Sequence, residues 1–487
     1  MLPENSAFIP FLIPFLGAIL TLFFPKGRWL AVLLLISSFM YSIWLSIETY
    51  QGKIFVSYAG SWPAPYGIAL AIDSLSSMML LFSNLVFMLA TFYGFTEEGH
   101  YYRLPLLFLL QAGVSLSFIT ADFFNLFVAF EILLTSSYVI LLLESPKEER
   151  GKAFPYIMIN IVGSFLFLTA AAMAYGATGN LNMAALHISL AENPGSPLVI
   201  GIAIVALIIY GLKAGLFPFY FWLPQAYPLL PYSLAGLFGG ILTKVGVYVL
   251  IRLFVTVLPH ELVAFHSVML ILAGLTMFLG VLGAMCQVRI KHILSYHILS
   301  QVGYMVLGLG VFTASSLAAA LLFVVHNIIV KSSLFWIGGQ AAVRGGGDEL
   351  GSMRTLWKTA PLLGVCFLLQ ALSLAGVPPL SGFWGKYLLF SAAMESEYYL
   401  LLFFAALTSF WTLFSMVKIW LGAFWGEDQV TVKKPFGTWG ITAIAASVVV
   451  SLCLGIGVET AYKFSLHAAD EVLNPSNYVQ AVLRGRE

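Results

Sequence analysis

Charged residues are scarce in this chain of 487 residues, of which 9% are Asp, Glu, Lys or Arg and 60% are hydrophobic. Soluble domains carry about 25% charged residues, so this composition excludes a soluble globular protein. A net charge of +1 leaves no basic surface for nucleic acid. Abundant Phe, Tyr and Trp, 15% of the chain, exclude disorder. We therefore predict a polytopic membrane protein, in agreement with the mean hydropathy of +0.94.

Cysteine and enzyme motifs are also scarce. Cys286, Cys366 and Cys453 lie in apolar stretches without metal-ligand spacing, so we interpret them as small core residues. The sequence contains no nucleophile elbow, HExxH, CxxC or GxGxxG in a supporting context, and no paired mid-span histidines for a haem. We assign no hydrolytic site, cofactor or metal. The first residues lack the basic region of a cleavable signal, which predicts a retained first span.

Long apolar runs replace these motifs. Runs of about 20 residues, which cross a hydrocarbon core of roughly 30 Å, recur along the whole chain. Strand-type alternation is absent, so we predict an all-α bundle rather than a barrel. The fourteen expected spans are residues 7–25, 29–48, 68–95, 104–120, 123–143, 154–176, 199–222, 234–257, 264–287, 293–313, 315–340, 360–391, 398–425 and 437–458.

Basic residues in the loops predict the orientation, because cytoplasmic loops are enriched in Lys and Arg. Thirteen lie in odd-numbered loops and four on the other side, which places both termini outside. The thirteen are Lys26, Arg28, Arg103, Lys147, Arg150, Lys152, Arg289, Lys291, Arg344, Arg354, Lys358, Lys433 and Lys434, and the four are Lys53, Lys463, Arg484 and Arg486.

The charges inside the spans are the informative ones, because a charge at the bilayer centre costs at least about 2.5–3.5 kcal/mol. Snorkelling to the headgroups is the favoured explanation for Arg252, Lys331 and Lys418. It does not explain the deeper charges, for which we favour function over a structural ion pair. Those deeper residues are Glu131, Lys213, Lys244 and Lys386.

Two spans are interrupted by helix-breaking residues. Gly215 and Pro218 follow Lys213, and Pro378 and Pro379 precede Lys386. Irregular backbone at membrane depth survives only where it is buried or lines a cavity. The Ala-Gly pairs at 214–215 and 375–376 are 161 residues apart, which suggests two inverted five-helix repeats, spans 4–8 and 9–13. We expect units at 1–95, 96–257, 258–425 and 426–487.

The buried titratable groups suggest a proton relay. A carboxylate near a buried lysine stabilises the protonated lysine, so Glu131 paired with Lys213 could control proton release to Lys244. His326, in the middle of a span, is interpreted as a relay to Lys386 rather than a satisfied core histidine. The polar stretch that contains Ser295, His297 and Ser300 is interpreted as the lining of a hydrated half-channel, and Lys331 and Lys418 complete this secondary set.

The motifs around these residues resemble the proton-pumping antiporter-like subunits, a superfamily found in respiratory complex I, membrane-bound hydrogenases and Mrp-type cation/proton antiporters. The resemblance covers nearly the whole chain. It is carried by Leu126–Glu131, Leu212–Pro218, Gly239–Gly246, Ile293–Tyr304 and Ser373–Lys386.

Within this superfamily the chain is most similar to the D subunit of Mrp antiporters. Asn125–Tyr138, Thr178–Ala184 and Phe424–Glu427 favour this assignment, as does Tyr220, where complex I relatives commonly have His. The resemblance implies fourteen helices and the relay of Glu131, Lys213, Lys244, His326 and Lys386, which we call the relay residues. It also implies Na⁺/H⁺ exchange in the cell membrane of a bacterium or archaeon, with a larger A-type subunit and small subunits as partners.

Two other functions remain open at this point. The chain could be a pumping subunit of a quinone- or ferredoxin-linked oxidoreductase, or a scaffold whose buried charges merely pair. Glu131 is the only acid well inside a predicted span, so the sequence shows no set of oxygen ligands that could coordinate Na⁺. We therefore assign the proton path to this chain and Na⁺ to partners or interfaces.

Overall fold

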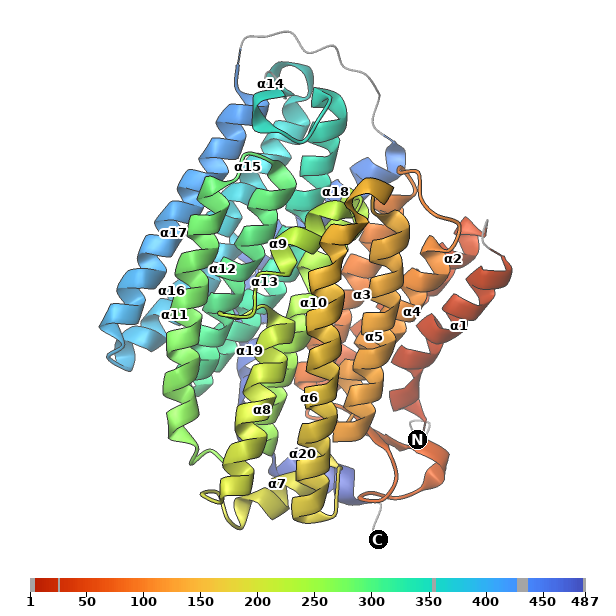
Figure 1. The fold of residues 1–487 in the computed structure, drawn as a ribbon, viewed down its shortest axis with the longest axis vertical. Coiled ribbons are helices and arrows are strands. Elements are labelled where there is room, and N and C mark those ends of the chain that lie inside the picture. Colours follow the sequence, from red (N-terminus) through yellow and green to blue (C-terminus); the bar gives the residue numbers. More distant parts are fainter. Residues whose placement is uncertain (1–4, 25–26, 353–355, 427–436, 485–487) are drawn as a thin grey trace.

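The protein is an elongated bundle of helices (Figure 1), described by a computed structural model over residues 5–24, 27–352, 356–426 and 437–484. The basic residues Lys26, Arg354, Lys433, Lys434 and Arg486, and Glu427, lie outside the described residues. The helices that run along the bundle are α1 (Ile9–Phe23), α2 (Arg28–Tyr50), α3 (Ser74–Gly94), α4 (Arg103–Ile119), α5 (Phe123–Glu144), α6 (Phe154–Thr178), α8 (Pro197–Ala214), α10 (Tyr232–Ile251), α11 (Val263–Cys286), α12 (Ile290–Val311), α13 (Ala314–Gly345), α15 (Pro361–Ala375), α16 (Ser381–Glu395), α17 (Tyr399–Ile419) and α18 (Thr438–Ile456).

The predicted helical bundle is confirmed. Twelve helices in the described ranges are long and apolar enough to cross a membrane, and α4 and α15 are shorter apolar helices. The count of fourteen spans therefore stays a prediction, although a helix lies within each expected range.

Both helix breaks lie where the glycines predict them. Helix α8 ends at Ala214 and α15 at Ala375, and the next residues, Gly215 and Gly376, adopt left-handed conformations with φ of 80° and 88°. Glycine accepts this conformation because it has no Cβ. The chain resumes as the short α9 (Leu223–Ala226) in the first case and as α16 in the second.

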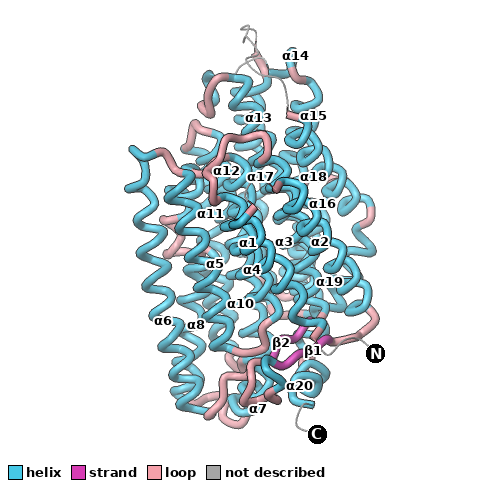
Figure 2. Tube along the Cα trace, turned by 90° about the vertical axis from the view of Figure 1, so that its right-hand side faces the viewer, coloured by secondary structure: helices cyan, strands magenta, loops and turns pink. Residues whose placement is uncertain are grey.

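Several short elements lie outside the expected spans. Strands β1 (Phe55–Tyr58) and β2 (Ala69–Ile72) pair antiparallel, so the expected span 68–95 begins as a strand, and helix α3 starts only after Asp73. Figures 1 and 2 show that α7 (Met183–Ala191), α20 (Ser476–Leu483), the strands and both ends of the chain share one end of the bundle. At the opposite end lies α14 (Leu356–Thr359).

Helices α10, α12 and α13 form the centre of the molecule. The apolar stretches of α10 and α13 are completely buried, whereas those of α1 and α6 are one-third buried. Small residues allow this close packing: a Cβ on Gly239 of α10 would meet Ile298 of α12, and one on Gly240 would meet Ser332 of α13.

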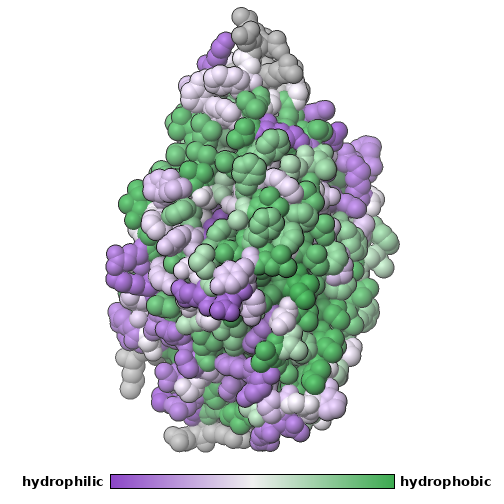
Figure 3. Space-filling view, turned by 90° about the vertical axis from the view of Figure 1, so that its left-hand side faces the viewer, coloured by the Kyte–Doolittle hydropathy of each residue, from purple (hydrophilic) through white to green (hydrophobic). Residues whose placement is uncertain are grey.

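Large apolar side chains cover the outside of the bundle, among them Leu33, Phe165, Leu400 and Phe410. In Figure 3, hydrophobic residues occupy much of one face, and hydrophilic ones gather mostly in its lower part and near its upper margin. Such a surface suits lipid. The interpretation of all three cysteines as core residues is wrong, because Cys286 and Cys453 are exposed on this surface and Cys366 is partly exposed.

Candidate functional site

Glu131 and Lys213 face the same side of α6. The Ser164 hydroxyl donates to Oε1 of Glu131 (2.5 Å), and Nζ of Lys213 donates to the side-chain and backbone oxygens of Asn160 (3.1 and 3.3 Å). Between these two contacts, Gly163 leaves room for Lys213, whose Nζ would lie 3.5 Å from a Cβ there. Within the described chain Glu131 and Lys213 interact electrostatically without forming a direct ion pair.

Lys213 lies in the last turn of α8, where that helix touches α10. A Cβ on Gly246 would lie 2.6 Å from the backbone of Ala214, so this glycine brings the end of α8 against α10. Lys244 lies two residues earlier on α10, is fully buried, and donates to the carbonyl of Gly239 (2.6 Å). The break after Lys213 thus lies beside the helix that carries the next relay residue.

Lys331 occupies the middle of α13 and is fully buried. Snorkelling is therefore the wrong explanation for this residue, because its ammonium does not reach the surface. In the part of the chain that the structure describes, its Nζ has no hydrogen-bond partner. It interacts electrostatically with Lys244 of α10 and with Lys386 of α16, which are relay residues of both halves.

His326 lies five residues before Lys331 on the same helix and joins α13 to α16. Its Nδ1 lies 2.8 Å from the Ser381 hydroxyl, which in turn lies 3.0 Å from that of Ser373 and 3.4 Å from that of Ser451. Its Nε2 has no partner among the described residues. One ring nitrogen is thus held by a hydroxyl cluster, and the relay role of His326 stays a prediction.

Lys386 caps the broken helix. Its ammonium donates to the carbonyls of Leu374 and Ala375 (3.0 Å each), the last residues of α15, and to the Ser409 hydroxyl (2.9 Å). It also lies 5.0 Å from the centre of the Tyr304 ring. The partial negative charge at a helix C-terminus stabilises a cation, so the break supplies the site of this buried lysine.

The polar segment of α12 is buried. Nε2 of His297 lies 2.9 Å from the Ser415 hydroxyl, and Ser295 donates to the carbonyl of Lys291 in its own helix. Ser300 accepts from the amide of Gln301 (3.0 Å). Lining of a hydrated half-channel stays a prediction for these three residues.

Two charged residues lie away from the relay. Lys418 donates to the carbonyls of Met285 and Gln287 (2.8 and 2.6 Å) and so caps the end of α11; snorkelling stays a prediction for this half-buried residue. Arg252 does not snorkel, since it is 2% exposed. It forms a bidentate ion pair with Asp73 (2.6 and 2.8 Å).

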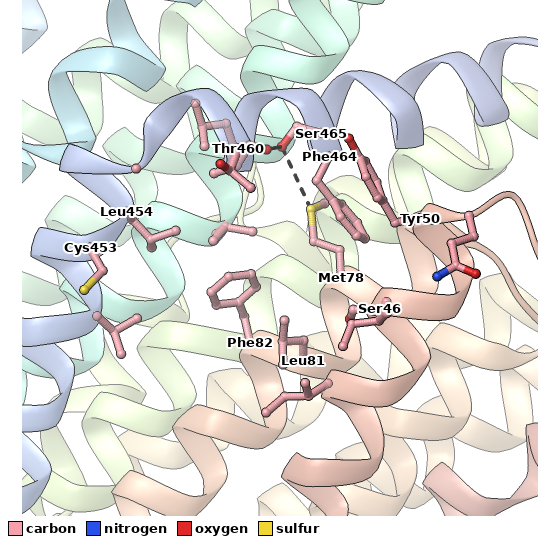
Figure 4. Close-up of a pocket in the computed structure, with 18 residues that line it drawn as sticks. Ser46, Tyr50, Met78, Leu81, Phe82, Cys453, Leu454, Thr460, Phe464 and Ser465 are labelled. Carbon is pink, nitrogen blue, oxygen red and sulfur yellow. Dashed lines mark hydrogen bonds between the residues drawn. The ribbon is translucent and has the colours of Figure 1, made fainter.

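An apolar cavity of about 590 Å³ is not part of the relay. Figure 4 shows its mostly apolar walls, which come from α2, α3, α18 and α19 (Val458–Leu473). Val325 lines it, one residue before His326, but none of the relay residues does. Its apolar walls suit hydrocarbon rather than a hydrated ion.

Sequence reasoning missed the neutral polar partners of the relay. Asn160 and Ser164 are one turn apart on α6, and their i, i+4 spacing around Gly163 was a usable signal. Ser381 and Ser409 were not detectable in this way, because they reach His326 and Lys386 from helices distant in sequence.

Fold and site together define a polytopic membrane subunit with titratable groups buried across its interior. The family model described as NADH:quinone oxidoreductase/Mrp antiporter, TM matches residues 120–415. The D subunits of two bacterial Na⁺/H⁺ antiporters match 99% of this chain over their full length, at 40% identity in Alkalihalophilus pseudofirmus and 35% in Bacillus subtilis. The chain belongs to the NADH:quinone oxidoreductase/Mrp antiporter family, among its antiporter D subunits.

Solved structures show the same fold. A chain of the Mrp complex from Dietzia sp. superposes with a TM-score of 0.94 at 28% identity, covering 99% of this chain and all of that one. A chain of an archaeal membrane-bound sulfane sulfur reductase covers the same shares with a TM-score of 0.90 at 25% identity. Respiratory complex I from Thermus thermophilus shares the fold with a TM-score of 0.84.

Proposed function

We propose that this chain is the proton-translocating subunit of a multisubunit Na⁺/H⁺ antiporter in a bacterial or archaeal cell membrane, with both termini outside. The observation that carries the proposal is the series of buried titratable groups, Lys213, Lys244, Lys331, His326 and Lys386. Such groups are costly in a membrane interior and mark proton relays. Protonation of one group changes the proton affinity of the next, which couples proton movement through the series.

The same residues make a Na⁺ path through this chain unfavourable. The buried lysines repel a metal cation whenever they are protonated, and Glu131 already accepts a hydrogen bond from Ser164. We therefore assign proton transfer to this subunit and Na⁺ passage to partner subunits or their interfaces. The A-type and small subunits of an Mrp complex are the proposed partners.

The proposed relay has two halves. We propose that residues 96–257 and 258–425 are inverted five-helix units, each with a helix ended by an Ala-Gly pair in the left-handed conformation. Residues 1–95 and 426–487 then flank these units. In each half, a buried lysine lies beside the break, and Lys331 of the second half interacts electrostatically with Lys244 of the first.

The test is Na⁺-driven proton movement in vesicles that contain the purified complex. We expect Lys244→Ala to lower antiport by at least about tenfold, because loss of a relay group removes a proton-transfer step worth roughly 10²–10⁴. Lys418→Ala, a lysine bound only to carbonyls of the described chain, is the matched control and should retain antiport. Complex levels must be equal in both variants.

Two outcomes would contradict the proposal. Normal antiport by Lys244→Ala would exclude the relay, and reduced complex levels with normal specific activity would support the scaffold. A pumping subunit of an oxidoreductase is the alternative with the same fold; antiport by the complex without any added electron donor excludes it.

A further inference from the structure

A second cluster of titratable side chains lies at the end of the bundle that carries both termini. Asp73 caps the first turn of α3 by accepting from the backbone N–H of Ser76 (2.9 Å). The same carboxylate accepts two hydrogen bonds from the guanidinium of Arg252, in the π-helical turn that ends α10. Asp73 and Arg252 are each 2% exposed, so this ion pair is inside the protein.

A second carboxylate caps the same helix. Oε2 of Glu471, on α19, accepts from the backbone N–H of Ser74 (3.0 Å). Unpaired N–H groups and the helix dipole favour negative charge at this position. The Glu471 side chain is 17% exposed, and Nε2 of the more exposed His467 lies 3.3 Å from its Oε1. The cluster thus extends from the buried ion pair to the surface.

The cluster also reaches towards the relay along α10. Lys244, Tyr248 and Arg252 are spaced four residues apart and so share one face of that helix. The Tyr248 hydroxyl lies 3.2 Å from that of Ser76 and 3.3 Å from Nη2 of Arg252. The same hydroxyl donates to the carbonyl of Phe118 on α4 (2.6 Å), so Tyr248 joins the Asp73–Arg252 pair to α10 and α4.

The positive and negative charges of the cluster do not cancel. Arg252 balances Asp73, whereas the basic side chain beside Glu471 is His467. Burial and then the charge of Asp73 raise the pKa of Glu471, although Ser74 and His467 oppose this rise. For Asp73, burial is outweighed by the charge and hydrogen bonds of Arg252, which lower its pKa.

Other elements complete the surroundings of the two carboxylates. Tyr478 of α20 lies 5.0 Å from the Arg252 guanidinium, and Tyr50 of α2 lies 5.6 Å from the His467 ring. Figure 4 shows the adjacent turn of α19, where Phe464 lies near Tyr50 and Ser465 contacts Met78 of α3. The C-terminal helices α19 and α20 thus hold the cluster against α3 and α10.

From this arrangement we infer that Glu471, backed by the Asp73–Arg252 pair, is an outward proton-binding site that controls transport and is coupled to α10 through Arg252 and Tyr248. The inference rests on the proposed function. A proton from external water binds the Glu471 carboxylate and removes its repulsion with Asp73. The Asp73–Arg252 pair, which holds the start of α3 to the end of α10, is then left with balanced charges.

The experiment measures antiport by the vesicle-reconstituted complex while external pH varies and internal pH stays fixed. Glu471→Gln keeps an oxygen that can accept from Ser74 but removes proton binding near neutral pH. We expect the external pH at half-maximal transport to fall by at least about one unit, which is a tenfold higher proton concentration. Glu459→Gln, on the same helix and paired with exposed Lys463, should keep the wild-type profile.

Tyr248→Phe provides a second test that does not depend on whether Glu471→Gln alters assembly of the complex, because it removes one hydroxyl and keeps the ring. We expect a lower maximal rate at every external pH. An unchanged external-pH profile in Glu471→Gln, or an equal change in Glu459→Gln, overturns the proton-binding site, and an unchanged rate in Tyr248→Phe overturns its coupling to α10. Retained transport in Lys244→Ala would instead contradict the proposed function itself.

Discussion

At the residue scale, neutral polar side chains determine how the buried lysines are held. Both hydrogen bonds of Lys213 in the described chain go to Asn160, so we expect Asn160→Ala to lower antiport by roughly tenfold, the loss of one charge-assisted hydrogen bond of about 1.5–3 kcal/mol. Thr169→Ala, on the same helix but exposed and bonded to its own helix, is the control. Equal rates in both variants, at equal complex levels, would show that Asn160 has no role in the relay.

The buried lysines could be identified from the sequence one residue at a time, but their hydrogen-bond partners could not. Rarity made Lys213, Lys244 and Lys386 visible in the sequence, because a charge inside an apolar run has few structural explanations. Partners such as Ser381 and Ser409 were not visible, since serine is common in membrane helices. Snorkelling was predicted wrongly for Arg252 and Lys331 for a related reason. Nearness to the end of an apolar run suggests snorkelling, but only the packed neighbours decide whether an interior site exists.

At the scale of the element, the two breaks depend on glycines in the left-handed conformation. We expect Gly376→Ala to lower antiport and stability, because left-handed backbone costs a non-glycine residue roughly 1–2 kcal/mol and the new Cβ would lie 2.9 Å from Cδ of Lys386. Gly179→Ala carries the same backbone cost at φ 69° with no neighbour within 4 Å. It should reduce thermal stability in the purified complex but retain specific antiport activity. Loss of activity in both would mean that strain, rather than displacement of Lys386, is responsible.

The start of α5 carries a pH-dependent cost to stability. Burial raises the pKa of Asp122, which is 7% exposed and caps this helix, from 3.8 to about 6. The folded state then binds the proton more tightly than the unfolded state, so its stability falls as pH rises from about 4 to 6. Asn keeps the cap without the charge, and we expect Asp122→Asn to be more stable at pH 8 by up to about 3 kcal/mol. The gain should vanish near pH 4 in thermal unfolding; an equal gain at both values would contradict this explanation.

Element prediction succeeded where the physical signal is local. The length of the apolar runs predicted the helices, and the glycine and proline residues predicted the two breaks. The strands at 55–58 and 69–72 were missed because their pairing partner, rather than their own pattern, makes them strands. The C-terminal helices α19 and α20 were missed because they lie outside the long apolar runs, and this is where Glu471 and Tyr478 are located.

At the scale of the whole molecule, one buried ion pair joins the helices at the α14 end. Arg103 of α4 bonds Glu144 at the end of α5 and lies 3.6 Å from Glu97, which accepts from Ser233 of α10. Breaking a buried pair costs about 3–5 kcal/mol, and we expect Glu144→Gln to approach the lower value because Glu97 remains. Glu149→Gln, in an exposed pair with Lys152, should not change the melting temperature of the complex. Equal effects would show that burial of the Arg103 pair is not important.

Orientation in the membrane is also a property of the whole molecule, and it determines whether Glu471 lies on the outer side. Gly151 lies among Lys147, Arg150 and Lys152 at one end, and Gly195 lies in the connection between α7 and α8 at the end shared with both termini (Figure 1). A Cβ at either position meets no neighbour within 4 Å, so both accept cysteine without strain after the three native cysteines are replaced. Because Lys and Arg favour the cytoplasmic side, a membrane-impermeant maleimide should label Gly195→Cys in intact cells and Gly151→Cys only after the membrane is opened. The reverse pattern would invert the predicted topology and would turn the Glu471 cluster into a cytoplasmic site.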